Sequence, residues 1–244
     1  MNTMKKIILL VLAVFFALTV WSQNSIPMLG ETAPSFTAES TIGKLNFPED
    51  YGKSWKMLFS HPKDFTPVCT SEILQLAKMQ DEFNELDVKI AVISVDELST
   101  HYEWKQYMEN ILLEETEESV KINFPFIDDN SVRVSNKYGM LHAWENETRD
   151  VRGVFILNPE NEIQSISFYP NNIGRNLEEI KRLIIALQTS QRDQVMTPVN
   201  WEQGDDVLLK HIPYSESELM ENPDLKDQYY KVGVNMWFKR GSIN

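Results

Sequence analysis

The stretch WKMLFSHPKDFTPVCTSEILQLAKMQDEFNEL, residues 55–86, sets the interpretation of this chain. Its first six residues, 55–60, have the length and apolar character of a buried strand. Residues 72–86 repeat apolar positions at the spacing of a helix. Between the two lies a loop with two prolines that ends at Cys69. The stretch therefore predicts a strand, a constrained loop and a helix, with Cys69 in the opening turn of that helix.

Similar signals continue along the chain. Further strands are predicted over 88–95, 151–157 and 163–168, and further helices over 100–113 and 177–187. Strands that alternate with helices indicate an α/β domain. The sequence NPEN at 158–161 is typical of a hairpin turn between the last two strands. We therefore expect a mixed central sheet flanked by helices.

The chain changes character from about Thr197, where prolines and a Gly-Asp-Asp turn interrupt scattered aromatic residues. Too few apolar residues lie there to form a separate core. We expect residues 193–244 to form an arm or small second domain that packs on the main domain, residues 23–192, or on a partner subunit.

The N-terminus has the pattern of a signal peptide. Lys5 and Lys6 precede an apolar run from Ile7 to Val20, and the small residue Ser22 offers a cleavage site before Gln23. The run is shorter than the roughly 20 residues of a transmembrane helix. We expect residues 1–22 to direct export to the periplasm of a bacterium, with an uncleaved membrane anchor as the alternative.

Charge excludes one class of partner. The whole chain carries a formal charge of −13, and without residues 1–22 it has 21 basic against 36 acidic residues, a charge of −15. Such a surface repels phosphates, which argues against nucleic acid or an anionic membrane as the main partner. The same field leaves small neutral substrates unaffected.

Cys69 is the only cysteine, so no internal disulfide can form. A lone thiol in an exported protein is either a buried inert residue or a reactive one. At the start of a helix, unpaired backbone N–H groups and the helix dipole stabilise a thiolate, which is the nucleophilic form. Thr66 can turn its hydroxyl toward the sulfur, or it can be a simple N-cap or turn residue. Pro62 and Pro67 restrict the loop backbone.

The residues around Cys69 resemble the active-site sequence of a known family. Pro62-x-x-x-Thr66-x-x-Cys69 matches the active-site signature of the peroxiredoxins (AhpC/TSA superfamily), and the surrounding residues 59–70 are similar to the 1-Cys, peroxiredoxin-six-type branch. The similarity continues through residues 151–155, 169–170, 174–176 and 197–205. It therefore extends over nearly all of the chain after residue 22.

The resemblance implies a thioredoxin-like fold, a homodimer, no cofactor and a peroxidase reaction. Cys69 would attack hydrogen peroxide or an organic hydroperoxide and become a sulfenic acid, which an external thiol would reduce. Thr66 would hydrogen-bond the reacting atoms, and Pro62 would shield the sulfur. Arg152 would stabilise the thiolate and orient the peroxide. Supporting positions near the cysteine are His61, Val68 and Arg175.

The sequence also bears on three other interpretations. Some members of this branch have a lipase-like Gly-x-Ser-x-Gly element, but here it reads Gly52-Lys53-Ser54-Trp55-Lys56, and Pro48 occupies the expected histidine position. We therefore predict no phospholipase activity. A non-catalytic binding module of the same fold would keep its partner affinity when Cys69 is replaced by serine. The scattered histidines and the acidic run at 114–118 lack the spacing of a metal site, so no metal is predicted.

Overall fold

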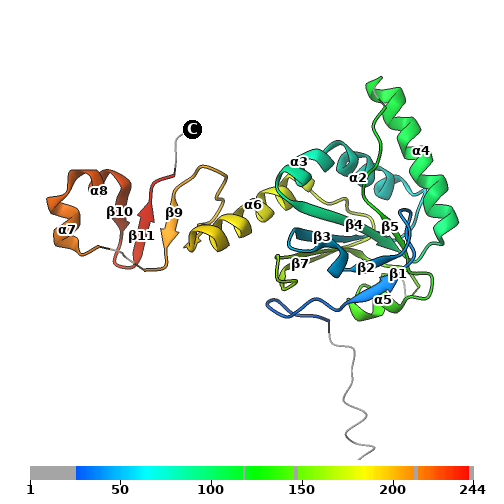
Figure 1. Cartoon of the computed structure of the whole chain (residues 1–244), viewed down its shortest axis with the longest axis horizontal. Helices are drawn as coiled ribbons and strands as arrows, with labels where there is room; N and C mark the ends of the chain where they lie inside the picture. Colours follow the sequence, from blue (N-terminus) through cyan, green and yellow to red (C-terminus); the bar gives the residue numbers. More distant parts are fainter. Residues whose placement is uncertain (1–25, 118, 146–147, 212–213, 242–244) are drawn as a thin grey trace, which may run out of the picture. The chain divides into compact units, whose positions relative to one another are not determined.

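The structure is a computed structural model that describes residues 26–117, 119–145, 148–211 and 214–241. It divides into two compact units, the first ending at Arg175 and the second beginning at Asn176 (Figure 1). The expected signal peptide, residues 1–22, lies outside the described residues. No helix among the described residues is long and apolar enough to cross a membrane.

The first unit is built on a five-stranded sheet in the order β5-β4-β3-β6-β7. Strands β3 (Trp55–Ser60), β4 (Val88–Ser94) and β5 (Phe126–Asp128) are parallel to one another, β6 (Arg152–Leu157) pairs antiparallel with β3, and β7 (Ile163–Tyr169) pairs antiparallel with β6. The predicted mixed sheet and the 158–161 hairpin are therefore confirmed. Every residue of β3 and β6 is buried, as expected for central strands covered on both faces.

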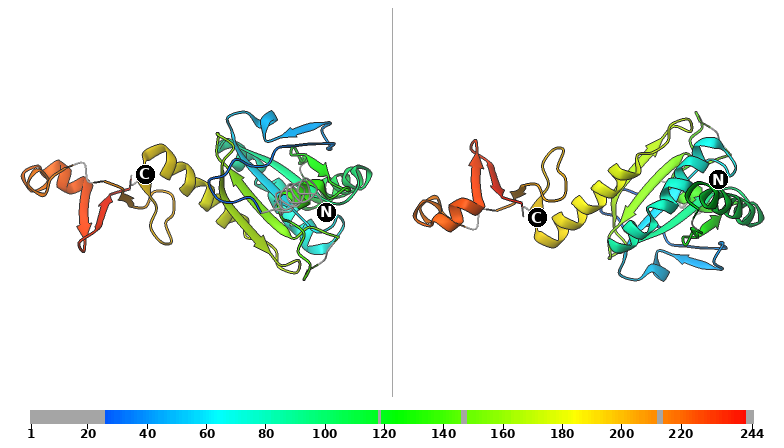
Figure 2. Two further views of the ribbon diagram at one scale, coloured as in Figure 1. Left: turned by 90° about the horizontal axis from the view of Figure 1, so that it is seen from below. Right: turned by 90° about the horizontal axis from the view of Figure 1, so that it is seen from above.

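The two faces of this sheet are covered by different elements. One face, which includes Leu58 and Phe155, packs in a core with the hairpin β1 (Phe36–Ala38) and β2 (Leu45–Phe47) and with helix α5 (Arg133–Lys137). On the other face, Trp104 of helix α4 (Leu98–Thr116) contacts the ring of Phe126. Both views in Figure 2 place the blue N-terminal hairpin and the cyan helices on opposite sides of the sheet.

The helix predicted over 72–86 is two helices, α2 (Pro67–Lys78) and α3 (Gln80–Glu85). Met79 separates them with backbone angles of φ −97° and ψ 0°, outside the helical region. Helix α2 also begins five residues earlier than the apolar periodicity indicates. Pro67 occupies its first turn, where a missing N–H has no consequence for the helix.

The second unit begins with the long helix α6 (Leu177–Asp193) and continues into a small antiparallel sheet of order β10-β11-β9-β8. Its strands are β8 (Val195–Met196), β9 (Val207–Leu209), β10 (Tyr229–Val232) and β11 (Met236–Lys239). Two short helices, α7 (Glu216–Glu221) and α8 (Pro223–Gln228), precede β10. Stacked rings of Tyr230 and Phe238, 5.0 Å apart, pack within this sheet.

Candidate functional site

The site is organised around the first turn of α2. Cys69 is the third residue of this helix and is fully buried. Thr66 is the N-cap residue, with extended backbone angles, and its side chain makes no capping hydrogen bond. The first N–H groups of α2 therefore have no side-chain acceptor at the cap, and the positive end of the helix dipole lies beside the sulfur.

The residues around Cys69 in the loop are held by local contacts. The Thr66 hydroxyl donates to the carbonyl oxygen of Lys63 at 2.9 Å, so its hydrogen is directed to the loop rather than to the sulfur. The lone pairs of that oxygen are still available to accept a hydrogen bond. Pro62 is buried, and Val68 is half-buried.

Arg152 lies directly against the sulfur. Because β6 is antiparallel to β3, with Val154 opposite Phe59, the start of β6 lies beside the end of β3, where the Cys69 loop begins. The Nη1 of Arg152 donates to Cys69 Sγ at 3.2 Å. Its Nε and Nη2 both donate to the carbonyl oxygen of Asn171, at 3.2 and 2.7 Å. The guanidinium is buried, so its orientation is set before any substrate arrives.

Glu72 is a member of the site that the sequence did not single out. It lies one helical turn after Cys69, and its Oε2 accepts from Arg152 Nη1 at 2.7 Å and from Arg175 Nη2 at 2.8 Å. Burial alone raises the pKa of Glu72, but hydrogen bonds and charge from Arg175, with Arg152 adding charge, outweigh it and hold that pKa below its ordinary value. The available signal was a carboxylate three residues after Cys69, on the same helix face.

Arg175 makes its hydrogen bonds to Glu72 and to backbone carbonyl oxygens rather than to the sulfur. Its backbone N–H and Nε donate to Glu72 Oε1 at 2.7 and 2.8 Å. Its Nη1 donates to the carbonyl oxygens of Ser60 and Gly153, and the guanidinium lies 3.2 Å from the ring centre of Phe59. Burial lowers the pKa of Arg175, but a guanidinium stays charged in proteins. Arg175 therefore joins the ends of β3 and β6 to helix α2.

The charges of this cluster favour a thiolate. Arg152 and Arg175 contribute two positive charges and Glu72 one negative charge, all buried. An ionised sulfur would balance the remaining positive charge, whereas a neutral thiol would leave it uncompensated. Buried charge is costly without a partner. The geometry therefore provides an anion site at Cys69.

The chain is similar to known proteins over most of its length. The profile of the AhpC/TSA family matches residues 29–166, and that of the C-terminal domain of 1-Cys peroxiredoxin matches residues 186–217. A peroxiredoxin of Methanosarcina mazei is 42% identical over 212 residues, which cover 87% of this chain and 95% of the relative. The chain belongs to the AhpC/TSA family of peroxiredoxins. It is a thiol-dependent peroxidase.

Other relatives agree with this assignment. Human peroxiredoxin-6 is 38% identical over 196 residues, covering 78% of this chain and 87% of the relative. The structure of a yeast mitochondrial 1-Cys peroxiredoxin aligns with a TM-score of 0.75 and 34% identity, covering 88% of this chain and 99% of that one. A peroxiredoxin 6 mutant of Arenicola marina aligns with a TM-score of 0.77 and 31% identity, covering 89% and 99%. The fold is thus the thioredoxin-like fold of the peroxiredoxins, as predicted.

Beside the peroxiredoxin site lies a buried carboxylate shared by two histidines. Asp64 Oδ1 is 2.7 Å from His61 Nε2, and Asp64 Oδ2 is 2.7 Å from His101 Nδ1. Burial raises the pKa of Asp64, but hydrogen bonds from His101 and His61 outweigh it, so the pKa is lowered. The Nε2 of His101 also faces the carbonyl oxygen of Ile127, at 3.1 Å.

This network places His61, which the resemblance put near the cysteine, against α4. Its ring lies 5.0 Å from that of Trp104, whose Nε1 donates to the hydroxyl of Thr70, the residue after Cys69. His61 Nδ1 is buried and has no hydrogen-bond partner among the described residues. His61 is therefore positioned by Asp64 and connected to the α2 turn through Trp104.

The same region contains the one candidate group of metal-binding side chains found among the described residues. Ligand-type atoms of His61, Asp64 and Asp96 lie within 4.8 Å of one another. Asp64 is occupied by the two histidines, and Asp96 Oδ2 accepts from the backbone N–H of Asp64 and the hydroxyl of Ser94. Ordinary hydrogen bonds account for this arrangement, so we assign it no metal.

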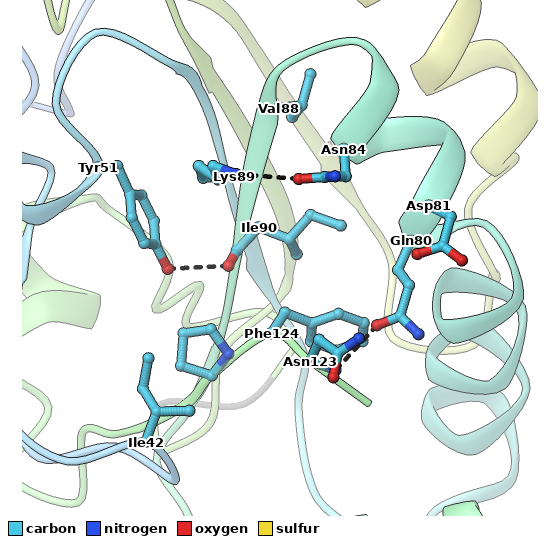
Figure 3. Close-up of a pocket in the computed structure, with 11 residues that line it drawn as sticks. Ile42, Tyr51, Gln80, Asp81, Asn84, Val88, Lys89, Ile90, Asn123 and Phe124 are labelled. Atoms are coloured by element: carbon cyan, nitrogen blue, oxygen red, sulfur yellow. Dashed lines mark hydrogen bonds between the residues drawn. The ribbon is translucent and has the colours of Figure 1, made fainter. Parts of the chain in front are cut away.

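Two other features of the first unit lie outside the site. Figure 3 shows a pocket of about 320 Å³ between Tyr51, α3 and the start of β4. Two of its polar side chains are paired: Tyr51 donates to the carbonyl oxygen of Ile90, and Lys89 donates to Asn84. The hydroxyl of Ser54, in the lipase-like element, donates to Asp87 at 2.6 Å. Nothing in these contacts activates Ser54 as a nucleophile.

Proposed function

We propose that Cys69 is the residue that reduces the peroxide, with Arg152 as the group that holds its sulfur ionised. The observation that supports this most directly is the 3.2 Å contact between Arg152 Nη1 and the buried Cys69 Sγ. The sulfur also lies at the N-terminal turn of α2, so a fixed charge and a helix dipole act on the same atom.

The reaction follows from this arrangement. The thiolate attacks one oxygen of the peroxide, the O–O bond breaks, and the second oxygen leaves with its electron pair and takes a proton to become water or an alcohol. Cys69 is then a sulfenic acid. Arg152 and the free N–H groups of the α2 turn are fixed donors for the negative charge that develops on the leaving oxygen.

Thr66 and Pro62 complete the proposed site. The Thr66 hydroxyl, already donating to the carbonyl oxygen of Lys63, keeps its lone pairs to accept a hydrogen bond from the O–H group of a hydroperoxide. Pro62 and Val68 limit the water that reaches the sulfur. His61 and Arg175 position the surrounding residues, through Trp104 and Glu72 respectively.

The test combines a mass measurement with matched variants. A brief pulse of dilute peroxide, followed by a reagent that traps sulfenic acids, should label Cys69 in the wild-type protein. Cys69→Ser should lose peroxide turnover entirely, and Ser54→Ala, which alters a half-buried serine outside the site, should retain it. Full turnover by Cys69→Ser would overturn the proposal.

We propose further that an external thiol returns the sulfenic acid to the thiol. The chain has a single cysteine, so two electrons must come from another molecule: one thiol forms a mixed disulfide with Cys69 and releases water, and a second thiol resolves it. The related yeast structure is described as resolved through the glutathione and thioredoxin systems. Comparing steady turnover with a small thiol alone and with a thioredoxin system distinguishes the two classes of reductant. If neither of them sustains turnover, this step is contradicted.

The assembly and location are also proposals. We propose residues 23–192 as the peroxidase domain and residues 193–244 as an arm that supports a homodimer, since the 1-Cys C-terminal profile matches residues 186–217. We propose that residues 1–22 direct export, to the periplasm of a bacterium, and that the released protein binds no membrane. Strictly monomeric sedimentation at micromolar concentration, or a full-length chain that stays in the cytoplasm, would contradict these proposals.

A further inference from the structure

Asp150 is a buried carboxylate that the reaction described above does not use. It lies two residues before Arg152, at a bridge with Leu141, just before β6 begins. Its side chain is fully buried. Both carboxylate oxygens lack a hydrogen-bond partner among the described residues. An ionised carboxylate in such a place is strongly disfavoured.

The surroundings of Asp150 add to this cost. Asp129, in the loop after β5, accepts from the backbone N–H groups of Val134 and Ser135 and from the Ser135 hydroxyl at 2.6 Å, so it is well suited to carry a negative charge. Asp96, after β4, is a second nearby acid. The nearby Ser135 hydroxyl lowers the pKa of Asp150, but its hydrogen is given to Asp129, and burial outweighs its effect. Burial first, and then the charges of Asp129 and Asp96, raise the pKa of Asp150 well above its ordinary value.

The backbone beside Asp150 is tied directly to the reactive site. The N–H of Val151 donates to the carbonyl oxygen of Met140 at 2.8 Å, and the carbonyl oxygen of Val151 accepts from the Ser60 hydroxyl at 2.7 Å. The same Ser60 oxygen accepts from the N–H of Gly153 at 2.8 Å. Arg152 lies between these anchors. A shift of Asp150 toward solvent would pull on Val151 and so on the guanidinium that contacts Cys69.

We propose that Asp150 is kept as the uncharged acid and is a positioning residue for Arg152. When it loses its proton, the unpaired charge opens the entry to β6 and withdraws Arg152 from Cys69. The protein thereby loses peroxidase activity on the alkaline side through a group that never touches the substrate. This inference depends on the role proposed for Arg152.

The first test is the pH profile of the rate of Cys69 oxidation, which is measured in the full chain by stopped-flow tryptophan fluorescence. Wild type should lose rate toward alkaline pH by about a hundredfold, the usual cost of one preorganised donor. Asp150→Asn, nearly the same in shape and unable to ionise, should keep its rate. The control Asp81→Asn, an exposed acid of α3, should follow wild type. An alkaline loss identical in Asp150→Asn and wild type overturns the proposal.

The second test separates Asp150 from the role of Arg152. Because the native protein holds this proton more tightly than the unfolded chain, wild-type stability falls relative to Asp150→Asn as pH rises above about 4. The ratio of their unfolding constants should change by about tenfold per pH unit, then level off once the native acid has ionised. If this trend is present but the alkaline rate is unchanged, the coupling to Arg152 is wrong. If wild-type stability shows no such trend relative to either Asp150→Asn or Asp150→Leu, the proposal that Asp150 is buried as an uncharged acid is wrong.

Discussion

Replacing Glu72 with glutamine should make Cys69 more easily ionised and the protein less stable. Glu72 Oε2 and Cys69 Sγ both accept from Arg152 Nη1, at 2.7 and 3.2 Å. The two acceptors are therefore no more than 5.9 Å apart, the sum of those two distances. At an effective dielectric constant of about 20, a carboxylate and a thiolate at that separation repel by about 3 kcal/mol.

Removing this repulsion shifts the ionisation equilibrium of Cys69 toward the thiolate by about a hundredfold. Stability should change in the opposite direction. Glutamine cannot neutralise the charges of Arg152 and Arg175, and breaking a buried ion pair on one side costs about 3–5 kcal/mol. The variant should thus combine a more reactive sulfur at acidic pH with a lower free energy of unfolding.

The assay is a titration of the thiolate by its ultraviolet absorbance, supported by alkylation rates across the same pH range and by urea unfolding at neutral pH. The matched control is Glu115→Gln, which removes an exposed ion pair with Lys78. That change should cost no more than about 1 kcal/mol and leave the thiol titration unaltered. If Glu72→Gln ionised at the same pH as wild type, or at a higher one, the charge balance described for this site would be refuted.

Four further predictions concern the same unit. Arg152→Lys keeps the charge, but one ammonium cannot bind Cys69, Glu72 and the Asn171 carbonyl together, so the rate of oxidation by peroxide should fall about 10²–10³-fold in stopped-flow measurements; an unchanged rate would contradict this. The lowered pKa values of Glu72 and Asp64 contribute stability at neutral pH that is lost as pH falls below about 4, so urea unfolding should show a steep acid decline rather than a flat profile. Asp64→Asn should cost about 3 kcal/mol in urea unfolding because the amide has no charge and leaves only one oxygen to accept from the two buried histidines, whereas the exposed control Asp81→Asn should be nearly neutral, and equal effects would argue against the network. No phospholipase activity is expected; ester release that disappears in Ser54→Ala would show the prediction wrong.

Much of the first unit could be predicted because its signals are local. The apolar run Trp55 to Ser60 became β3 with the predicted bounds, and the hairpin at 158–161 paired β6 with β7. Shorter elements were missed. Strand β5 has three residues and α5 has five, and segments of that length carry too few positions to show a period. Their structure comes from packing against neighbours rather than from their own sequence.

Residues 55–86 by themselves determined the strand, the proline-containing loop and the position of the cysteine at a helix start. All three features depend on neighbours only a few positions away. The charge balance at the sulfur depended on the tertiary structure. Arg152 and Glu72 meet across 80 positions of the chain, and Arg175 and Glu72 across 103. The buried isolation of Asp150 likewise exists only after α5 and β6 have packed together. Hydrogen bonds and desolvation act through space, so a pattern along the chain could point to Cys69 and, through the resemblance, to Arg152 and Arg175, but not to Glu72 or to the contacts that join these groups.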